Sequence, residues 1–282
     1  MPRVSVLTPI YNTNPAHLRE CIESILNQTF TDFEFLILND SPDNLDLDRL
    51  VESYAKRDSR IRYMKNEKNM GISAARNKLL DLAYGEYLAI FDHDDISVPT
   101  RLEQQVAYLD AHPDVGVVSG LLESFGVKNY VWSAPENDID IRIYLTCNCH
   151  VAHTAAMIRK SVLVDNDIKY EEFFSPAEDY RLWARLMDVT HFYNIQQVLV
   201  KYRTHNNMTS LQQEQKMNLA WRAISTQLRN QYPAYYNALK KCPHANVTFF
   251  RLRLFGIIPI LKIENNWVLL FDLIPIFKLK WR

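Results

Sequence analysis

Glycine is scarce in this chain, with six glycines among 282 residues. No Gly-x-Gly-x-x-Gly follows the first predicted strand, where the sequence instead reads Pro9-Ile10-Tyr11-Asn12. A dinucleotide-binding loop is therefore excluded, and the chain has no glycine-rich loop to surround a phosphate group. Any phosphate in a ligand must be neutralised by a metal ion or by cationic side chains.

An excess of charge of one sign is lacking too, because 32 Lys and Arg residues stand against 33 Asp and Glu residues. Without a basic excess to neutralise a phosphate backbone, we expect no nucleic acid as a partner. The chain has four cysteines, no secretory segment and no apolar run of the ~18 residues that span a bilayer. These features predict free thiols and a cytoplasmic protein that is soluble or peripheral at a membrane.

Strands and helices alternate along much of the chain. Apolar runs of strand length are separated by segments of helical periodicity, such as the helix that Pro15 opens. This alternation predicts an α/β protein with a mainly parallel sheet and right-handed crossovers. Strands are predicted at 4–9, 33–38, 61–64, 87–91, 115–119, 153–158, 192–195 and 198–202, and helices at 15–28, 47–56, 99–112, 175–186 and 212–230, with a further helix opening at 69–77.

The strand at 87–91 runs directly into a cluster of acidic residues, Asp92, Asp94 and Asp95. Acids at the carboxyl end of a parallel strand face the ligand crevice of an α/β sheet. Asp92 and Asp94 are spaced to share a hard cation such as Mg²⁺ or Mn²⁺. The alternative is an acidic loop that caps the following helix through Asp95 or Ser97.

Residues 247–282 differ in kind from the rest of the chain. They carry six basic and two acidic residues, a net charge of +4 in a chain whose overall net charge is -1. An apolar and aromatic unit ending in lysine occurs twice, at 254–262 and 272–278. Basic residues interleaved with apolar ones suit an anionic membrane surface. A segment folded onto the domain, or a subunit interface, is the alternative.

A series of short motifs follows one order along residues 4–210. They are Val4-Ser5-Val6-Leu7-Thr8-Pro9-Ile10-Tyr11-Asn12, Asn39-Asp40, Asn69-x-Gly71-x-x-x-Ala75-Arg76-Asn77, Gly85-Glu86-Tyr87, Asp92-x-Asp94-Asp95, Glu178-Asp179 and Tyr202-Arg203-x-His205. With these motifs the chain resembles the inverting, metal-dependent glycosyltransferases of family 2, which have the GT-A fold. Among them, the bacterial lipooligosaccharide and capsule transferases that add GlcNAc or galactose look most similar.

The resemblance implies a domain organisation. A GT-A domain, with a Rossmann-like mixed and mainly parallel sheet flanked by helices, would occupy residues 1–210. Within it, residues 1–120 would form the nucleotide-binding half and residues 121–210 the acceptor half. Residues 211–282 would form a helical, basic and apolar C-terminal extension.

The resemblance also implies a site for a UDP-sugar donor. Asp40 would accept the uracil N–H, and Arg76 would lie near the base and the diphosphate. Asp94, with Asp92, would ligate the Mn²⁺ or Mg²⁺ that neutralises the leaving diphosphate. Strand-end polarity and turn chemistry are the alternative explanation of these residues. The nucleotide-sugar-binding residues would be Thr8, Pro9, Tyr11, Asp40, Asn69, Arg76, Asp92 and His205.

An inverting transfer needs one base that takes the proton of the attacking acceptor hydroxyl. The resemblance assigns this role to Asp179, with Glu178 beside it. Capping of a helix's first turn is the alternative for both acids. His205 is a candidate ligand of diphosphate or metal because neutral imidazole binds metals well, and a structural role is its alternative.

The processive polysaccharide synthases of this family carry Gln-x-x-Arg-Trp after the Glu-Asp motif, together with spanning helices, and this chain has neither. We therefore expect a single hexose or N-acetylhexosamine to be added to an oligosaccharide or lipid-linked saccharide acceptor. The setting would be bacterial surface glycan synthesis at the inner face of the cytoplasmic membrane. Two alternatives stay open: a haloacid-dehalogenase-like, Mg-dependent phosphatase, whose Asp-x-Asp normally ends the first strand, and a non-catalytic subunit that binds sugar nucleotides.

Overall fold

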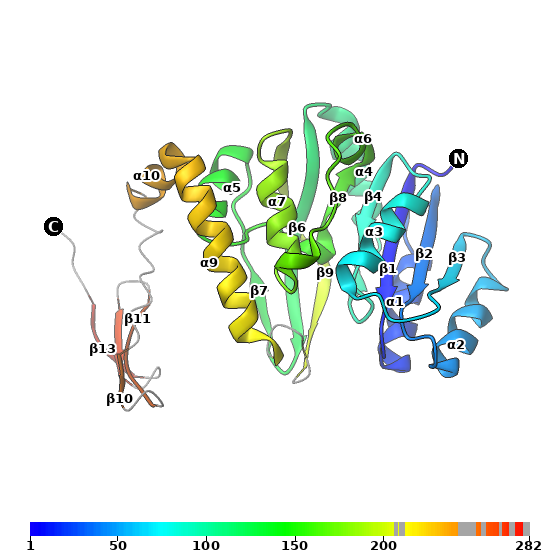
Figure 1. Cartoon of the computed structure of the whole chain (residues 1–282), viewed down its shortest axis with the longest axis horizontal. Helices are drawn as coiled ribbons and strands as arrows, with labels where there is room; N and C mark the ends of the chain where they lie inside the picture. The colour runs from blue at the N-terminus through cyan, green and yellow to red at the C-terminus, as the bar shows by residue number, and fades with distance from the viewer. Residues whose placement is uncertain are drawn as a thin grey trace. The chain divides into compact units, whose positions relative to one another are not determined.

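The computed structural model describes residues 1–205, 208, 212–241, 252–254, 258–264, 267–270 and 274–278. Contacts divide the chain into two compact units, residues 1–230 and 231–282. The first unit is built on a nine-stranded sheet (Figure 1). Its strands are β1 (Val4–Ile10), β2 (Phe33–Asn39), β3 (Ile61–Lys65), β4 (Tyr87–Ile90), β5 (Ile96–Ser97), β6 (Val115–Gly126), β7 (Tyr130–Trp132), β8 (Met157–Arg159) and β9 (His191–Thr204).

Four parallel strands, in the order β3-β2-β1-β4, form one half of this sheet. All residues of β1, β2 and β4 are buried, as expected for continuous apolar runs covered on both faces. Ile10 pairs with Asn39, so β1 and β2 end at the same level, whereas β4 ends earlier, where Ile90 pairs with Leu7. The residues that follow these strands therefore gather at one edge of the sheet.

The other half of the sheet is mixed, which confirms the predicted fold class. β8 is antiparallel to both β4 and β6, whereas β6 is parallel to β9. β7 pairs with β6, and the two-residue strand β5 pairs with β9. The pairing of β5 with β9 brings the segment just after the acidic cluster beside residues 200–201, which directly precede the last motif, Tyr202-Arg203-x-His205.

Two details of the predicted strands are wrong. Residues 153–158 are not one strand but a 3-10 turn, η1 (His153–Ala155), followed by β8. The hydroxyl of Thr154 in this turn donates to buried Asp95 (2.8 Å), a distant contact that no local pattern encodes. The strands predicted at 192–195 and 198–202 are the single strand β9, in which residues 196–197 form an irregularity opposite Gly120.

Helices cover both faces of the sheet. Helices α1, α2 and α4 contribute Ile22, Val51 and Leu109 to one hydrophobic core with the strands. Helix α3 contacts β1 and β2 but adds no residue to that core, and it lies with α7 on the viewer's side of the sheet in Figure 1. Pro15 opens α1, as predicted, and the Asn14 side chain caps it. The helices are α1 (Pro15–Leu26), α2 (Leu45–Ala55), α3 (Ile72–Leu82), α4 (Arg101–Ala111), α5 (Asp138–Leu145), α6 (Lys160–Asp165), α7 (Glu178–Leu186), α9 (Glu214–Gln231) and α10 (Pro233–Lys241), with a second 3-10 turn, η2 (Glu172–Phe174).

Helix α9 packs on the first unit, which therefore extends past residue 210. Leu228 is buried, and the ring of Trp221 meets the ring of Tyr180 edge-on at 5.9 Å between centroids. Arg229 donates to the carbonyl of Thr146 (3.1 Å). Within the described residues, no helix combines the length and the apolar character that a bilayer-crossing helix needs.

The described residues of the second unit form α10 and a four-stranded antiparallel sheet, β10 (Leu252–Leu254), β11 (Ile258–Glu264), β12 (Trp267–Leu270) and β13 (Ile274–Lys278). The sequence repeat is also a structural repeat. The copy at 254–262 contributes to β11, the second strand of the β10–β11 hairpin, and the copy at 272–278 contributes to β13, the second strand of the β12–β13 hairpin. Pro259 and Pro275 both pair beside a register shift. Proline has no N–H for the ladder and is confined to such irregular positions. Arg251, Lys280 and Arg282 of the basic tail lie outside the described residues.

Gly85 precedes β4 at a point where the chain touches β1. Its N–H donates to Ser5 Oγ (2.8 Å), and a methyl group at this position would lie 2.5 Å from the backbone nitrogen of Ser5. We predict that Gly85→Ala lowers the free energy of unfolding by about 1–3 kcal/mol, the usual cost of overpacking. Urea unfolding measures this change. An unchanged midpoint would show that β1 and β4 separate without cost.

Candidate active site

A cleft of about 800 Å³ opens at the carboxyl edge of the parallel strands. The loops after β1 and β2 and residues 67–69 line it. Tyr11, half exposed, lies on one side, while Arg49, Lys68 and Asn69 add polar and cationic groups. The predicted residues Thr8 and Pro9 are buried within β1, and the Thr8 hydroxyl donates to the Phe91 carbonyl (3.0 Å).

Asp40 follows β2 and is buried at the base of this region. Its carboxylate accepts hydrogen bonds from the amides of Asn66 (2.6 Å) and Asn69 (2.9 Å). The backbone N–H groups of Met70 (2.9 Å) and Gly71 (3.0 Å) also donate to it. Asp40 therefore orders the loop that brings Asn69 to the cleft, and its contact with uracil stays a prediction.

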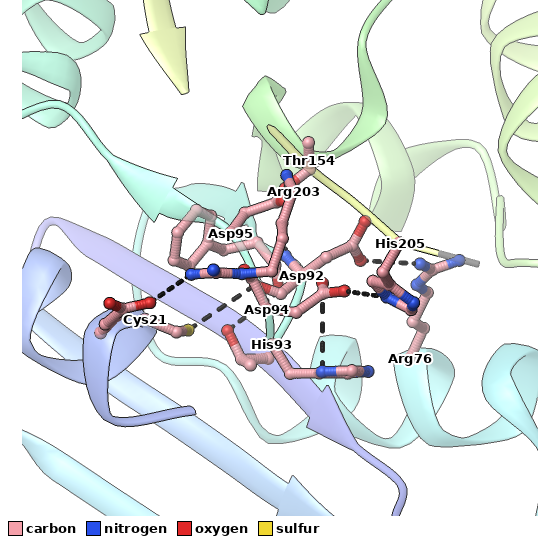
Figure 2. A network of polar contacts seen from close by, with 12 residues as sticks. Cys21, Arg76, Asp92, His93, Asp94, Asp95, Thr154, Arg203 and His205 are labelled. Carbon is pink, nitrogen blue, oxygen red and sulfur yellow. Dashed lines mark hydrogen bonds and ion pairs between the residues drawn. The ribbon is translucent and has the colours of Figure 1, made fainter. Parts of the chain in front are cut away.

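The acidic cluster follows β4, as predicted, and Figure 2 shows its polar contacts. Asp95 is fully buried and accepts hydrogen bonds from the Thr154 hydroxyl (2.8 Å) and the Arg203 N–H (2.9 Å). Burial, reinforced by the charges of Asp94 and Asp92, raises the pKa of Asp95 well above its usual range. The capping alternative is wrong, because Thr100 is the N-cap of α4 and the first-turn N–H of Leu102 donates to Gln28 Oε1 (3.0 Å) rather than to Asp95 or Ser97.

A buried cation, Arg101, lies close to the same loop. It donates to the carbonyls of Ile90 (2.8 Å) and Ala156 (3.3 Å) and is fully buried. Burial lowers the pKa of Arg101 to about 9, against the opposing effect of Asp95 and Asp92. Arg101 thus fixes the last residue of β4, from which the acidic cluster begins.

Asp94 and His205 converge from segments 111 residues apart. Asp94 Oδ2 lies 3.1 Å from His205 Nε2, and Figure 2 shows the two side chains pointing toward one another. Arg203 donates from Nε to the carbonyl of Asp94 (2.7 Å). His17, at the start of α1, lies beside them with its ring centroid 6.3 Å from that of His205. Among the described residues, no group of three or more His, Cys, Asp or Glu side chains could hold a metal ion by itself.

Arg76 on α3 links the acidic cluster to helix α7. Its guanidinium donates to Asp92 (3.1 Å) and to Glu178 (2.6 Å), and its carbon lies 5.6 Å from the centre of the Tyr170 ring. Burial acts to lower the pKa of Arg76, yet Asp92 and Glu178 raise it above its ordinary value. One buried cation therefore joins the loop after β4 to the first turn of α7.

Asp179 lies in the first turn of α7, next to Glu178. Burial, with the charge of Glu178, raises the pKa of Asp179 to about 7. Asp179 Oδ1 also accepts a hydrogen bond from the backbone N–H of Tyr180 (2.6 Å). This contact with a first-turn N–H is the kind that the capping alternative predicts. A carboxyl that titrates near neutral pH can take up a proton during a reaction at that pH.

Residues 5–165, more than half of the chain, match the sequence family described as glycosyl transferase family 2. The chain belongs to that family. An uncharacterized glycosyltransferase of Methanocaldococcus jannaschii is 32% identical over 241 residues, 81% of this chain and 80% of the relative. The amylovoran biosynthesis glycosyltransferase AmsE of Erwinia amylovora is 28% identical over 210 residues, 73% and 78% of the two chains.

Two solved structures share the fold of this family 2 glycosyltransferase. The crystal structure of residues 1–349 of S. aureus TarS with UDP-GlcNAc has a TM-score of 0.66 at 22% identity, covering 81% of this chain and 67% of that fragment. The mannosyltransferase PcManGT from Pyrobaculum calidifontis, in complex with GDP-Man and Mn²⁺, has a TM-score of 0.56 at 19% identity, covering 73% and 58%. The GT-A fold predicted from the motifs is confirmed. The comparisons give no support to the phosphatase alternative or to the non-catalytic alternative.

The family 2 glycosyltransferase fold brings most of the predicted site residues to one edge of the sheet. Arg76, Asp92 and Glu178 form one connected group, and Asp94 and His205 form a second beside it. Arg101 and Thr154 were missed by sequence reasoning. The hydroxyl inside the apolar run at 151–158 is the one local signal that marks Thr154, whereas nothing in the sequence distinguishes Arg101 from a surface residue of its helix.

We predict that Arg76→Met lowers the free energy of unfolding by about 3–5 kcal/mol, because it leaves the buried Glu178 carboxylate and the partly buried Asp92 carboxylate without their counter-ion. Arg49→Met is the matched control, since Arg49 pairs with Asp46 at an exposed site and should cost less than about 1 kcal/mol. Urea unfolding at pH 8 measures both variants. Equal losses for the two variants would contradict the role given to the Arg76 bridge.

Proposed function

We propose that this glycosyltransferase moves a single hexose or N-acetylhexosamine from a UDP-sugar to a saccharide acceptor, with inversion at the anomeric carbon. The Arg76 bridge carries the proposal. It joins Asp92, at the donor edge, to Glu178, whose neighbour Asp179 has the pKa of a general base. A donor bound against the acidic cluster would then present its reacting carbon near a base on α7.

The cleft at the carboxyl edge supports a nucleotide site. Tyr11 presents a half-exposed ring on which a base can stack, and Asn69 is held by Asp40 beside it. Lys68 and Arg49 add positive charge. Uridine is the proposed base because TarS, the more similar of the two solved structures, is in complex with UDP-GlcNAc.

Asp94 and His205 suit a divalent cation such as Mn²⁺ or Mg²⁺, with Asp92 next to them. A carboxylate oxygen and an imidazole nitrogen 3.1 Å apart can bind one ion together, and substrate oxygens would complete its coordination. The three acidic residues of the loop repel one another, which favours a cation. When bound, such an ion supplies positive charge that stabilises the leaving diphosphate.

The chain's own residues would divide the remaining work. Asp179 would accept the proton of the acceptor hydroxyl as that oxygen attacks the sugar. Arg76 would add fixed positive charge near the diphosphate. In the described part of the chain, the buried atoms Arg76 Nε and Glu178 Oε2 have no hydrogen-bond partner. Buried polar atoms are normally satisfied, so we infer that donor binding brings a phosphate oxygen and a sugar hydroxyl to these two atoms.

The biological setting is proposed from similarity and from the tail. AmsE is named for amylovoran biosynthesis, which supports a role in the synthesis of a bacterial surface glycan such as lipooligosaccharide or capsule. The basic tail, with its repeated hairpins, would hold the enzyme on the inner face of the cytoplasmic membrane, where a lipid-linked acceptor is located.

We predict that Asp94→Ala abolishes the Mn²⁺-dependent part of UDP binding, because a diphosphate without a metal or a glycine-rich loop has few other partners. Calorimetry of UDP binding with and without Mn²⁺ measures this effect. Asp81→Ala, which removes an exposed carboxylate paired with Lys169, is the control and should leave both titrations unchanged. UDP affinity that is independent of Mn²⁺ in the wild-type protein would contradict the metal assignment.

We predict that Asp179→Asn lowers kcat by at least ~10²-fold while the Kd for the UDP-sugar with Mn²⁺ moves little, because positioned base catalysis contributes ~10²–10⁴ in rate. A residue that only caps α7 would instead leave turnover per folded molecule intact, since Asn caps about as well as Asp. Steady-state kinetics, donor titration and thermal unfolding of one sample separate the two roles.

The pH profile is the second readout of this prediction. Asp179 must be deprotonated to act as a base, so activity should rise with pH through about 7 and be lost below it. Glu178→Gln removes the negative neighbour that helps to raise this pKa, and the acidic limb should move to lower pH. A limb that stays in place in Glu178→Gln would remove Asp179 as the group that titrates.

We predict that replacing Lys262 and Lys278, which occupy equivalent positions of the two repeats, by Gln weakens binding to anionic vesicles by about 2 kcal/mol, or roughly 30-fold. Replacing the exposed pair Lys56 and Arg57 by Gln removes the same charge from the first unit and is the control. Co-sedimentation with phosphatidylserine vesicles at two salt concentrations measures both. Equal losses would show that the tail has no special role.

A further inference from the structure

Asp95 is the last residue of the acidic cluster, and it contacts the end of β9 without reaching the protein surface. Its side chain is fully buried, and both carboxylate oxygens are occupied within the protein. Oδ1 accepts the backbone N–H of Arg203 (2.9 Å), and Oδ2 accepts the hydroxyl of Thr154 (2.8 Å). Asp95 therefore uses both oxygens within the protein, whereas Asp94 Oδ2 lies next to His205.

Thr154 extends this connection to the other side of the cluster. While its hydroxyl donates to Asp95, the same oxygen accepts the backbone N–H of Asp92 (3.1 Å). The two residues thus form one chain of hydrogen bonds, from Asp92 through Thr154 and Asp95 to Arg203, the four residues being labelled in Figure 2. This chain holds the backbone on both sides of Asp94.

The end of β9 is held to the cluster by further contacts. Arg203 Nε donates to the carbonyl of Asp94 (2.7 Å), and the Arg203 guanidinium also pairs with Glu20. Just beyond the cluster, Ile96 pairs with Lys201 in the β5–β9 ladder. His205 follows Arg203 by two residues, so its position relative to Asp94 depends on these bonds.

We propose that Thr154 and Asp95 are positioning residues of the donor site, which set the Asp94 carboxylate and the His205 imidazole at the spacing that binds the cation of the proposed function. A buried carboxylate costs desolvation energy that an apolar residue would avoid. The presence of Asp95 at this position is therefore better explained by the geometry that its hydrogen bonds set than by a gain in stability. Residues that orient metal ligands from behind typically change metal affinity ~10–100-fold when mutated.

Two substitutions of Thr154 separate hydrogen bonding from packing. Thr154→Val keeps the shape of the side chain but removes the hydroxyl, whereas Thr154→Ser keeps the hydroxyl but removes a methyl group. We expect Thr154→Val to weaken Mn²⁺ binding in the presence of saturating UDP by at least ~10-fold, and Thr154→Ser to stay within about 3-fold of the wild-type protein. Electron paramagnetic resonance of free Mn²⁺ measures the Kd directly, without turnover.

Thr146→Val is the matched control. Thr146 is also fully buried and donates to a backbone carbonyl, that of Ile143 (2.7 Å), but it lies at the end of α5 and outside the hydrogen-bond chain. Its Mn²⁺ affinity should equal that of the wild-type protein. Uridine, which carries no phosphate, should bind all these variants equally, and this shows that the base cleft is intact.

The opposite order of the two Thr154 variants, with Thr154→Ser weak and Thr154→Val normal, would overturn the proposal in favour of packing. Equal Mn²⁺ affinity of Thr154→Val and Thr146→Val would overturn it as well. If Thr154→Val does not fold, Asp95→Asn keeps the side-chain volume and replaces one of the two acceptor oxygens by an NH2 donor, so the side chain can no longer accept from both Arg203 and Thr154. An unchanged Mn²⁺ affinity in that variant overturns the proposal. Absence of Mn²⁺ binding in the wild-type protein with UDP would overturn the metal assignment itself, a result distinct from these.

Discussion

The ion pairs of Arg76 are the constraint on which the active-site arrangement depends. A buried guanidinium must be matched by nearby carboxylates, and Arg76 finds two of them, on Asp92 and Glu178. A planar guanidinium can donate to both at once, which a lysine ammonium does less well. The bridge spans 102 residues of sequence between Arg76 and Glu178. Helix α7, with Asp179 in its first turn, is thereby fixed against the end of β4.

Because the chain is poor in glycine, the carboxyl edge of the parallel strands must hold phosphate groups by other means than a glycine-rich loop. A chain without a glycine-rich loop offers few backbone N–H groups to a diphosphate. Its loop after β4 instead concentrates three carboxylates, two of them partly accessible and one buried. Arg101 and the hydrogen bonds to Asp95 stabilise this loop from inside. The surplus negative charge is then directed outward, where a divalent cation and a phosphate group can neutralise it together.

The mixed half of the sheet has a positional role in this arrangement. β9 runs beside β6 and ends beside the acidic cluster, so the last motif of the family comes to lie against the fifth. The irregularity at residues 196–197 lets one long strand pair along its length. The turn η1, inserted before β8, presents the Thr154 hydroxyl to the same cluster. Three segments distant in sequence therefore share one set of hydrogen bonds.

The sequence alone determined the buried parallel strands, the helix at Pro15 and the acidic cluster after β4, because apolar runs and capping residues act over a few neighbouring positions. Family motifs added the GT-A fold and the candidates Arg76 and Asp179. Only the tertiary structure decided that residues 153–155 form a 3-10 turn ahead of strand β8, and that Arg101 is buried. It likewise decided that Asp40 orders a loop. Each of these depends on partners many residues away, and burial and hydrogen bonding to such partners leave no periodic signal in the local sequence.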